Sequence, residues 1–235
     1  MTPDPQAPWA RLRMAALTPF SSLDFPGHLA AIVHLQGCPL ACPYCHSPHL
    51  QPPGPGALSP RDITGFLASR RGLLDGIVFS GGEPCAQAGL ADALAACRAQ
   101  GYATALHSAG TYPRALARLL PLLDWIGLDW KAPLDDTTPT TGRAGLGPRF
   151  ALALHAVLEA GIAHEIRTTW HPTLLPPAAM LAMAGQLARM RAGSWVIQPY
   201  WRPAHLKAPP LREAAFPPAL LAQIRAILPN TALRQ

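Results

Sequence analysis

The sequence lacks the features that usually identify nucleic-acid-binding, membrane and secreted proteins. The formal net charge is +6, but the basic residues are scattered and form no run of five or six. No apolar run reaches the length of a membrane span, and the polar, proline-rich residues 1–10 contain no signal-peptide core. The five cysteines are odd in number and three of them share one loop, so they do not indicate a disulfide framework. We therefore expect a cytoplasmic protein that binds neither nucleic acid nor a membrane.

Hydrophobic residues and prolines are, by contrast, abundant. The chain has 235 residues, of which 49% are hydrophobic, and this is enough to build one substantial core. Proline occurs 28 times, especially in 48–60 and 199–218, which predicts loops with restricted backbones in those stretches. We expect a single domain over residues 1–235, with proline-rich extensions at about 1–10 and 203–235.

Strand-like and helix-like patterns alternate along the whole chain. The strands are expected at 30–36, 76–80, 102–107, 125–129, 163–170 and 194–199. The helices are expected from Ser59 to Gly72, from Leu90 to Gly101, and at 113–123, 149–160, 177–191 and 215–227. This alternation predicts an α/β fold of βα units around a parallel sheet. Six such units are fewer than the eight of a full barrel, so we expect a partial (β/α)6 barrel.

Three cysteines with C-x3-C-x2-C spacing, Cys38, Cys42 and Cys45, directly follow the first predicted strand. Structural zinc and most iron–sulfur clusters take four protein ligands, whereas three thiolates on a four-iron cluster leave one iron open to a small molecule. The alternative is a closed Cys3His zinc site in which His49 supplies the fourth ligand. The preceding strand favours the cluster, because α/β barrels carry their chemistry on loops that leave the carboxyl ends of strands.

The cysteine spacing, with the aromatic Tyr44 directly before the third cysteine, resembles the radical S-adenosylmethionine (SAM) superfamily. The resemblance implies a partial barrel of the radical SAM type. It also implies a [4Fe-4S] cluster on Cys38, Cys42 and Cys45, with SAM bound to the open iron. The sequence Gly81-Gly82-Glu83 follows the second predicted strand and is similar to the motif that contacts the methionyl amine of SAM in this superfamily.

Further candidate SAM contacts lie at the ends of later strands. Ser108 fits the related Asp-Thr-Ser-Gly run, from which His107 and Ala109 depart. Strand alternation places Asp129 and Lys131 on one side, with Trp130 opposite. Arg167 lies in a β-rich stretch, where a buried guanidinium needs an anionic partner such as the SAM carboxylate. The full set of residues implied to bind SAM is Tyr44, Gly81, Gly82, Glu83, Ser108, Asp129, Lys131, Arg167 and Gln198.

One branch of the superfamily is most similar to this sequence. The stretches 17–27 and 45–48, together with later matches near Gln198, Arg202 and Pro203, resemble the activating protein of anaerobic ribonucleoside-triphosphate reductase. That resemblance implies reductive cleavage of SAM and formation of a glycyl radical on a partner enzyme, with a flavodoxin- or ferredoxin-type electron donor. Since the cofactors break the bonds, no side chain is nominated as a catalytic acid or base.

Two other functions remain open. The first is radical SAM chemistry on a small molecule, as in the 7-carboxy-7-deazaguanine synthases, although the segment 24–27 favours the activase. The second, from a different class, is a binding protein that contains zinc. The two remaining cysteines are expected to be structural, with Cys97 on the apolar face of a helix and Cys85 an unpaired small residue.

Overall fold

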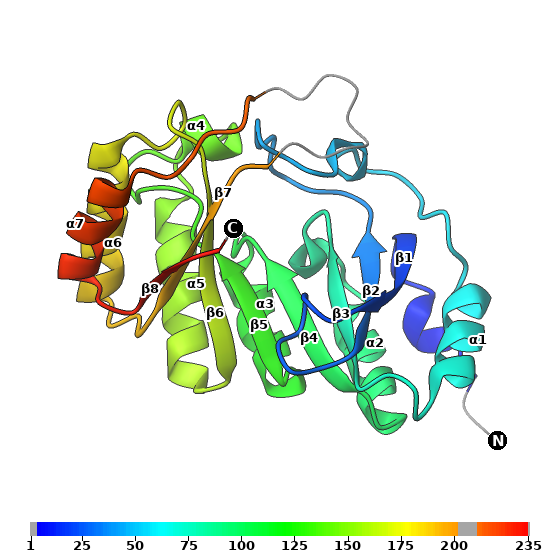
Figure 1. Cartoon of the computed structure of the whole chain (residues 1–235). Coiled ribbons are helices and arrows are strands. Elements are labelled where there is room, and N and C mark those ends of the chain that lie inside the picture. Colours follow the sequence, from blue (N-terminus) through cyan, green and yellow to red (C-terminus); the bar gives the residue numbers. More distant parts are fainter. Residues whose placement is uncertain (1–3, 202–210, 235) are drawn as a thin grey trace.

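An eight-stranded sheet with its strands in sequence order, β1 to β8, organises the molecule (Figure 1). The computed structural model describes residues 4–201 and 211–234. The strands are β1 Met14–Ser21, β2 Ala30–Leu35, β3 Gly76–Gly81, β4 Ala103–Ser108, β5 Trp125–Asp129, β6 Ala163–Trp170, β7 Trp195–Pro199 and β8 Thr231–Leu233. Strand β1 pairs with β2 in antiparallel orientation, and every later neighbouring pair is parallel.

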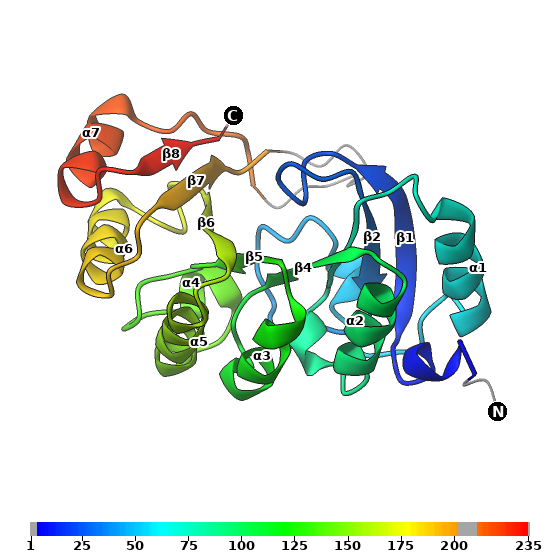
Figure 2. The ribbon, with the colours of Figure 1, turned by 90° about the horizontal axis from the view of Figure 1, so that it is seen from below.

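The helices lie along the convex side of the curved sheet, and the sheet stays open between β1 and β8 (Figure 2). They are α1 Pro60–Arg70, α2 Leu90–Ala99, α3 Pro113–Leu119, α4 Thr138–Thr141, α5 Gly147–Ala160, α6 Pro177–Arg189 and α7 Pro218–Ile227. Short 3-10 turns are η1 Ala7–Trp9, η2 Pro48–Leu50, η3 Pro84–Ala86 and η4 Leu120–Leu122. In the described residues, no helix is both long enough and apolar enough to cross a membrane.

Local sequence signals explain where these helices begin and end. Helix α1 starts with a capping box. The Ser59 side chain accepts from the backbone N–H of Asp62, and the Asp62 carboxylate accepts from the backbone N–H of Ser59. Proline occupies a first-turn position in α3, α6 and α7 as well, where its missing N–H costs nothing. Gly161 ends α5 with a φ of +65°, in the left-handed region that glycine tolerates.

The six expected strands and six expected helices are confirmed, and among the described residues two further strands and one further α-helix were not expected. Strand β1, the four-residue helix α4 and the three-residue strand β8 add to the predicted set. Both terminal segments also contribute to the core. Trp9 is fully buried and stacks on Phe79, while Leu220 and Ile224 of α7 are buried near α6.

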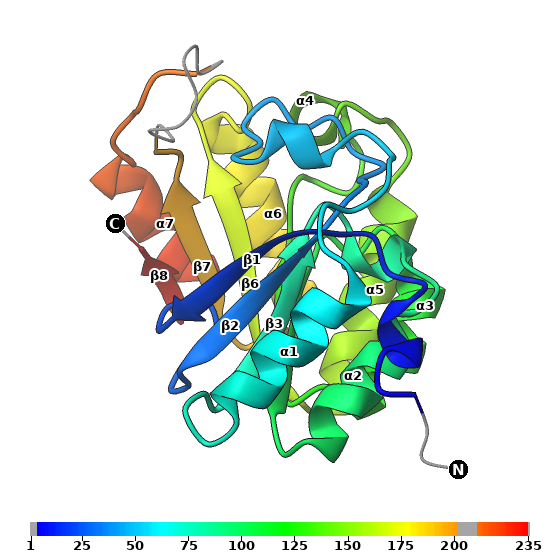
Figure 3. The ribbon, with the colours of Figure 1, turned by 90° about the vertical axis from the view of Figure 1, so that its right-hand side faces the viewer.

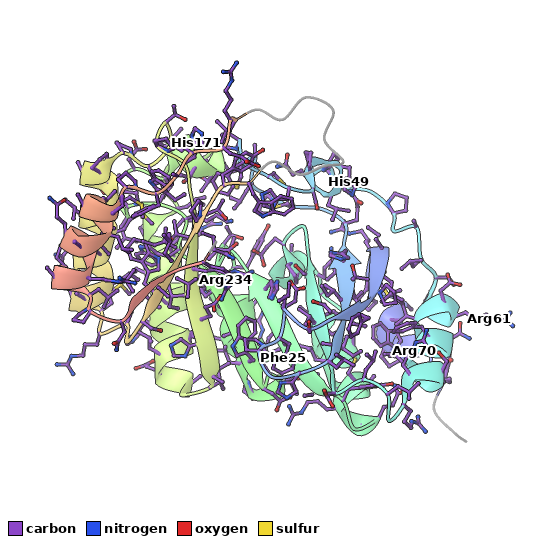
Figure 4. The ribbon with its side chains drawn as sticks, in the orientation of Figure 1. Phe25, His49, Arg61, Arg70, His171 and Arg234 are labelled. Atoms are coloured by element: carbon purple, nitrogen blue, oxygen red, sulfur yellow. The ribbon has the colours of Figure 1, made fainter. Side chains whose placement is uncertain are left out.

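The core has two parts, one on each side of the sheet. The larger lies between the sheet and the helices. The smaller lies on the concave side, where Phe25 packs with apolar residues at the amino ends of the strands, including Ala30 and Trp125. Phe25 belongs to the segment between β1 and β2, so this segment fills the concave side at the end opposite the strands' carboxyl ends (Figure 4).

Candidate functional site

The loop that carries the three close cysteines leaves the carboxyl end of β2 and is anchored at its start. The backbone N–H groups of Gly37 and Cys38 donate to the carbonyls of Leu50 and Gln51 at 2.8 and 2.9 Å. This loop, η2 and α4 all lie at the end of the molecule toward which the parallel strands point (Figure 3). The cysteines are free thiols and partly exposed, so they are accessible from the carboxyl edge of the sheet.

A cavity of about 270 Å³ opens at this edge and collects most of the predicted site. Its walls contain all three cysteines of the loop and seven of the nine predicted SAM-binding residues. The lining residues are His34, Cys38, Leu40, Cys42, Tyr44, Cys45, His46, Ser47, Gln51, Ser80, Gly81, Gly82, His107, Ser108, Ala109, Asp129, Lys131, Arg167 and Thr169. The residues come from the ends of β2 to β6 and from the loops after them, and parallel-strand geometry accounts for their convergence.

Asp129 binds two cations in the wall of this cavity. One carboxylate oxygen accepts from Lys131 Nζ at 2.9 Å and the other from Arg167 Nε at 2.7 Å. The anionic partner expected for Arg167 is therefore Asp129 within the free chain, while Glu165 pairs with Arg234. Burial opposes ionisation of Asp129, but the two cations outweigh it and hold its pKa well below the usual range. The site thus has three fixed charges with a net charge of +1.

The predicted strand alternation at this point is confirmed. Trp130 is buried in the core on the opposite side from its two charged neighbours. The Lys131 ammonium also lies 5.5 Å from the centroid of the Tyr44 ring, which places the aromatic residue of the cysteine loop over a cation. Asp129 and Lys131 are therefore a partly buried pair that faces the cysteines, and not an ion pair on the open surface.

Glu83 does not line the cavity, contrary to expectation. Its side chain is buried, and its carboxylate accepts from the backbone N–H groups of Cys85 and Ala109 and from the Ser108 hydroxyl, at 2.8 to 3.0 Å. Burial raises the pKa of Glu83, although these three donors oppose the shift. Glu83 therefore links the ends of β3 and β4. Ser108, whose hydroxyl donates to Glu83, itself lines the cavity.

The paired glycines are required by a backbone contact. A Cβ at Gly82 would lie 2.2 Å from the carbonyl oxygen of Gly37, and one at Gly81 would lie 2.4 Å from the Leu35 nitrogen. The Gly82 and Glu83 N–H groups donate to the carbonyls of Leu35 and Gly37. The turn after β3 therefore packs directly on the start of the cysteine loop, which explains the glycines without a bound molecule.

Gln198 is the other predicted contact that the structure does not bring to the cavity. It lies at the end of β7 and lines a separate cavity with Pro199, Tyr200 and Trp201. The associated resemblance at Arg202 and Pro203 lies outside the described residues.

Three histidines that were not predicted to bind SAM line the cavity, namely His34, His46 and His107. His107 Nε2 donates to the carbonyl of Asp24 at 2.9 Å, and His34 Nε2 lies 2.9 Å from the Thr18 hydroxyl. Burial, reinforced by the nearby Arg167, lowers the pKa of His107 to about 3, so the ring is neutral at physiological pH. His107 is the penultimate residue of β4, directly before Ser108. Its position near the carboxyl end of a strand is the sequence signal that could have identified it.

The loop offers three free thiols, the number that leaves one iron of a four-iron cluster open to a small molecule. In residues 4–201 and 211–234, no three His, Cys, Asp or Glu side chains converge on the position of one ion. Burial raises the pKa of Cys38 to about 11 and also raises that of Cys42. Both thiols are therefore protonated in the free protein, and metal binding must release their protons. Lys131 opposes both shifts and places a positive charge beside the future thiolates.

The other two cysteines have structural positions. Cys97 is fully buried among apolar residues of α2 and the adjoining core, as expected. Cys85 is buried behind the cavity wall, with its sulfur 3.5 Å from the Ser108 hydroxyl.

Comparison with known proteins gives the family. The model of the radical SAM superfamily matches residues 32–181, which is more than half of the chain. The pyruvate formate-lyase-activating enzyme of Clostridium pasteurianum is 32% identical over 169 residues, covering 69% of this chain and 70% of that protein. A provisional glycyl-radical enzyme activating enzyme of Methanocaldococcus jannaschii is 27% identical over 125 residues, covering 52% of this chain and only 51% of the relative.

Solved structures agree at the level of the fold. A radical SAM methyltransferase from Sphaerobacter thermophilus superposes with a TM-score of 0.65 at 19% identity, over 89% of this chain and 67% of that one. The expected partial barrel of the radical SAM type is thereby confirmed. Members of this superfamily use a [4Fe-4S] cluster and SAM, and the cavity offers three thiols beside a cationic wall. The chain belongs to the radical SAM superfamily and is homologous to the activating enzymes of glycyl-radical enzymes.

Proposed function

We propose that this protein is a radical SAM activase that generates a glycyl radical on a partner enzyme. The observation that carries the proposal is the single cavity shared by Cys38, Cys42 and Cys45 and by the Asp129–Lys131–Arg167 ion cluster. The similar proteins from Clostridium and Methanocaldococcus are named as activating enzymes, which supports activation of a glycyl-radical enzyme as the function of this chain.

The chain's own residues would bind and orient the two cofactors. Cys38, Cys42 and Cys45 would hold the cluster as thiolates, and Lys131 and Arg167 would bind the SAM carboxylate. The chemistry supplied by the bound cofactors is one-electron reduction of the SAM sulfonium, which releases methionine and a 5′-deoxyadenosyl radical. Asp129 would hold both cations in position, so that the protein contributes orientation and exclusion of water.

The proposed partner is anaerobic ribonucleoside-triphosphate reductase. This choice rests on the resemblance of residues 17–27 and 45–48 to the activating protein of that enzyme. A flavodoxin- or ferredoxin-type protein is the proposed electron donor, and the proposed location is the cytoplasm. The segment 24–27 also has a structural role. The Asp24 carbonyl accepts a hydrogen bond from His107, and Phe25 packs on the concave side of the sheet.

The cluster assignment is tested by reconstituting the protein with iron and sulfide under anaerobic conditions, then adding SAM and dithionite. We expect about four irons per chain and production of 5′-deoxyadenosine. Replacement of Cys38, Cys42 or Cys45 by alanine should abolish both. Cys97→Ala is the matched control and should retain iron, because that thiol lies in the helix core. Stoichiometric zinc without iron after anaerobic purification would contradict the assignment.

A further inference from the structure

Gly127 is a buried glycine in the middle of β5, two residues before Asp129. It pairs in register with His107 of β4 and with Glu165 of β6. Since side chains alternate along a strand, a side chain at position 127 would point to the same face as Trp125 and Asp129. This is the face on which the candidate SAM site lies, although Gly127 itself does not line the cavity.

The space that a side chain at position 127 would need is occupied by Arg167. A Cβ at Gly127 would lie 2.9 Å from Nη1 and 3.0 Å from Cζ of Arg167, and 2.9 Å from Cη2 of Trp125. Gly127 does not have a positive φ, so its backbone conformation does not itself require glycine. The reason for a glycine here is therefore steric, because the guanidinium of Arg167 lies across the strand at this position.

The guanidinium of Arg167 is bound at one nitrogen and available at the other two. Within the described part of the chain, its hydrogen bonding is confined to Nε, which donates to Asp129 at 2.7 Å. The side chain lines the cavity that contains the cysteines, and 16% of it is exposed. The two terminal nitrogens form a planar fork of donors, and this geometry fits a carboxylate.

The rings beside the guanidinium are packed and have little freedom to move. Trp125 is 7% exposed, and its ring lies 6.1 Å from that of Phe25 and 5.7 Å from that of His107, between centroids. His107 is fixed in turn, because its Nε2 donates to the Asp24 carbonyl at 2.9 Å. A methyl group added at position 127 would therefore displace the guanidinium, the end of a long flexible side chain, before it displaced these rings.

We propose that Gly127 is a positioning residue for SAM binding. The absence of a side chain at this position keeps the guanidinium of Arg167 beside Asp129, with its terminal nitrogens available to the SAM carboxylate. The inference rests on the proposed function for the identity of the ligand that Arg167 binds. The steric relation between Gly127 and Arg167 belongs to the free protein and can be tested without any cofactor.

The first test is NMR spectroscopy of the free protein. The arginine Nε–H resonance that disappears in Arg167→Ala identifies the group, and its slow exchange with water is expected because Nε donates to a partly buried carboxylate. In Gly127→Ala this resonance should shift and exchange faster. Gly193→Ala is the matched control and should leave it unchanged, because nothing lies within 4 Å of the added methyl group. An unchanged resonance in Gly127→Ala would overturn the proposal.

The second test is calorimetric titration of SAM into the protein reconstituted with iron and sulfide. Gly127→Ala should weaken SAM binding roughly tenfold or more with unchanged iron content, because the charge-assisted contact of Arg167 is misplaced. Arg167→Ala should weaken binding at least as much. The double variant should bind no more weakly than Arg167→Ala alone, since both substitutions act on the same contact. If the two effects multiplied instead, Gly127 would act independently of Arg167 and the proposal would be wrong.

Folding of the variants gives a further check. If Gly127→Ala does not fold, the double variant with Arg167→Ala should fold, because the guanidinium no longer occupies the position of the methyl group. Failure of both to fold would count against the steric argument. If the reconstituted wild type binds no SAM, the proposed function fails, whereas the NMR comparison still decides whether Gly127 positions Arg167.

Discussion

At the residue scale, Asp129 is the centre of the candidate site. It neutralises one of two cations that would otherwise face each other beside the cysteines. Removal of the anion from such a cluster lowers the stability of the folded protein, because two partly buried positive charges are left unpaired. The adjacent neutral His107 adds no charge to the site at physiological pH, because its pKa is lowered to about 3.

Asp129→Asn should destabilise the protein at neutral pH by about 1–3 kcal/mol, because hydrogen bonds to two cations are lost. The difference between wild type and variant should be constant above about pH 5 and should shrink as the pH falls below about 4. The pKa of Asp129 is lowered by folding, so its contribution is present above the unfolded-state pKa of about 3.9 and is lost as the pH falls toward the folded-state pKa. Urea unfolding at several pH values measures this. Asp135→Asn is the control, because this carboxylate is exposed. If the stability difference between wild type and Asp129→Asn did not change with pH, the proposed role of Asp129 would be contradicted.

Lys131→Ala should weaken SAM binding to the reconstituted protein by roughly tenfold or more, because it removes the charge-assisted contact that we propose between Lys131 and the SAM carboxylate. Iron content should stay unchanged, since Lys131 supplies no thiolate. Calorimetric titration with SAM, alongside iron analysis, separates these effects. An unchanged SAM affinity would remove Lys131 from the proposed site.

At the element scale, turns and short contacts between elements position the site. The turn after β3 packs on the cysteine loop through its glycines, and Glu83 ties the ends of β3 and β4 together. These contacts hold the cavity walls before any cofactor binds. The fold therefore provides a preorganised site on the carboxyl edge of the sheet.

Gly82→Ala should be severely destabilising or displace the cysteine loop, because the new Cβ would lie 2.2 Å from the Gly37 carbonyl oxygen. The expected result is a loss of several kcal/mol in unfolding free energy, or folded protein that incorporates much less iron. Gly65→Ala on α1 is the matched control, because nothing lies within 4 Å of the added methyl group and helix propensity improves. Thermal melts and iron analysis of both variants check this. A folded Gly82→Ala variant with full iron content would contradict the packing argument.

The strands of the parallel sheet could be predicted because apolar runs alternate with amphipathic segments that glycines and prolines delimit. Strand β1 was missed because it contains Pro19, and because seven of its eight residues are only partly buried or exposed, without regular alternation. Helix α4 and strand β8 are too short to show a period. The structural role of Glu83 depends on donors 25 and 26 residues away, which no local pattern reveals.

At the scale of the whole molecule, the open sheet gives access to one edge. Strands β1 and β8 do not pair, and the segment between β1 and β2 fills the concave side only at the strands' amino ends. The carboxyl end carries the cavity with the cysteines. A partner's peptide loop would approach from this end, where the proposed radical forms.

The most direct test of the activase proposal is electron paramagnetic resonance of the reconstituted protein mixed with anaerobic ribonucleoside-triphosphate reductase, SAM and reductant. We predict a stable glycyl radical on the reductase, and no radical with the Cys42→Ala variant. A second mixture, in which a pyruvate formate-lyase replaces the reductase, shows which of these two enzymes receives the radical. Formation of 5′-deoxyadenosine together with consumption of a small molecule, and without a radical on either protein, would contradict the account.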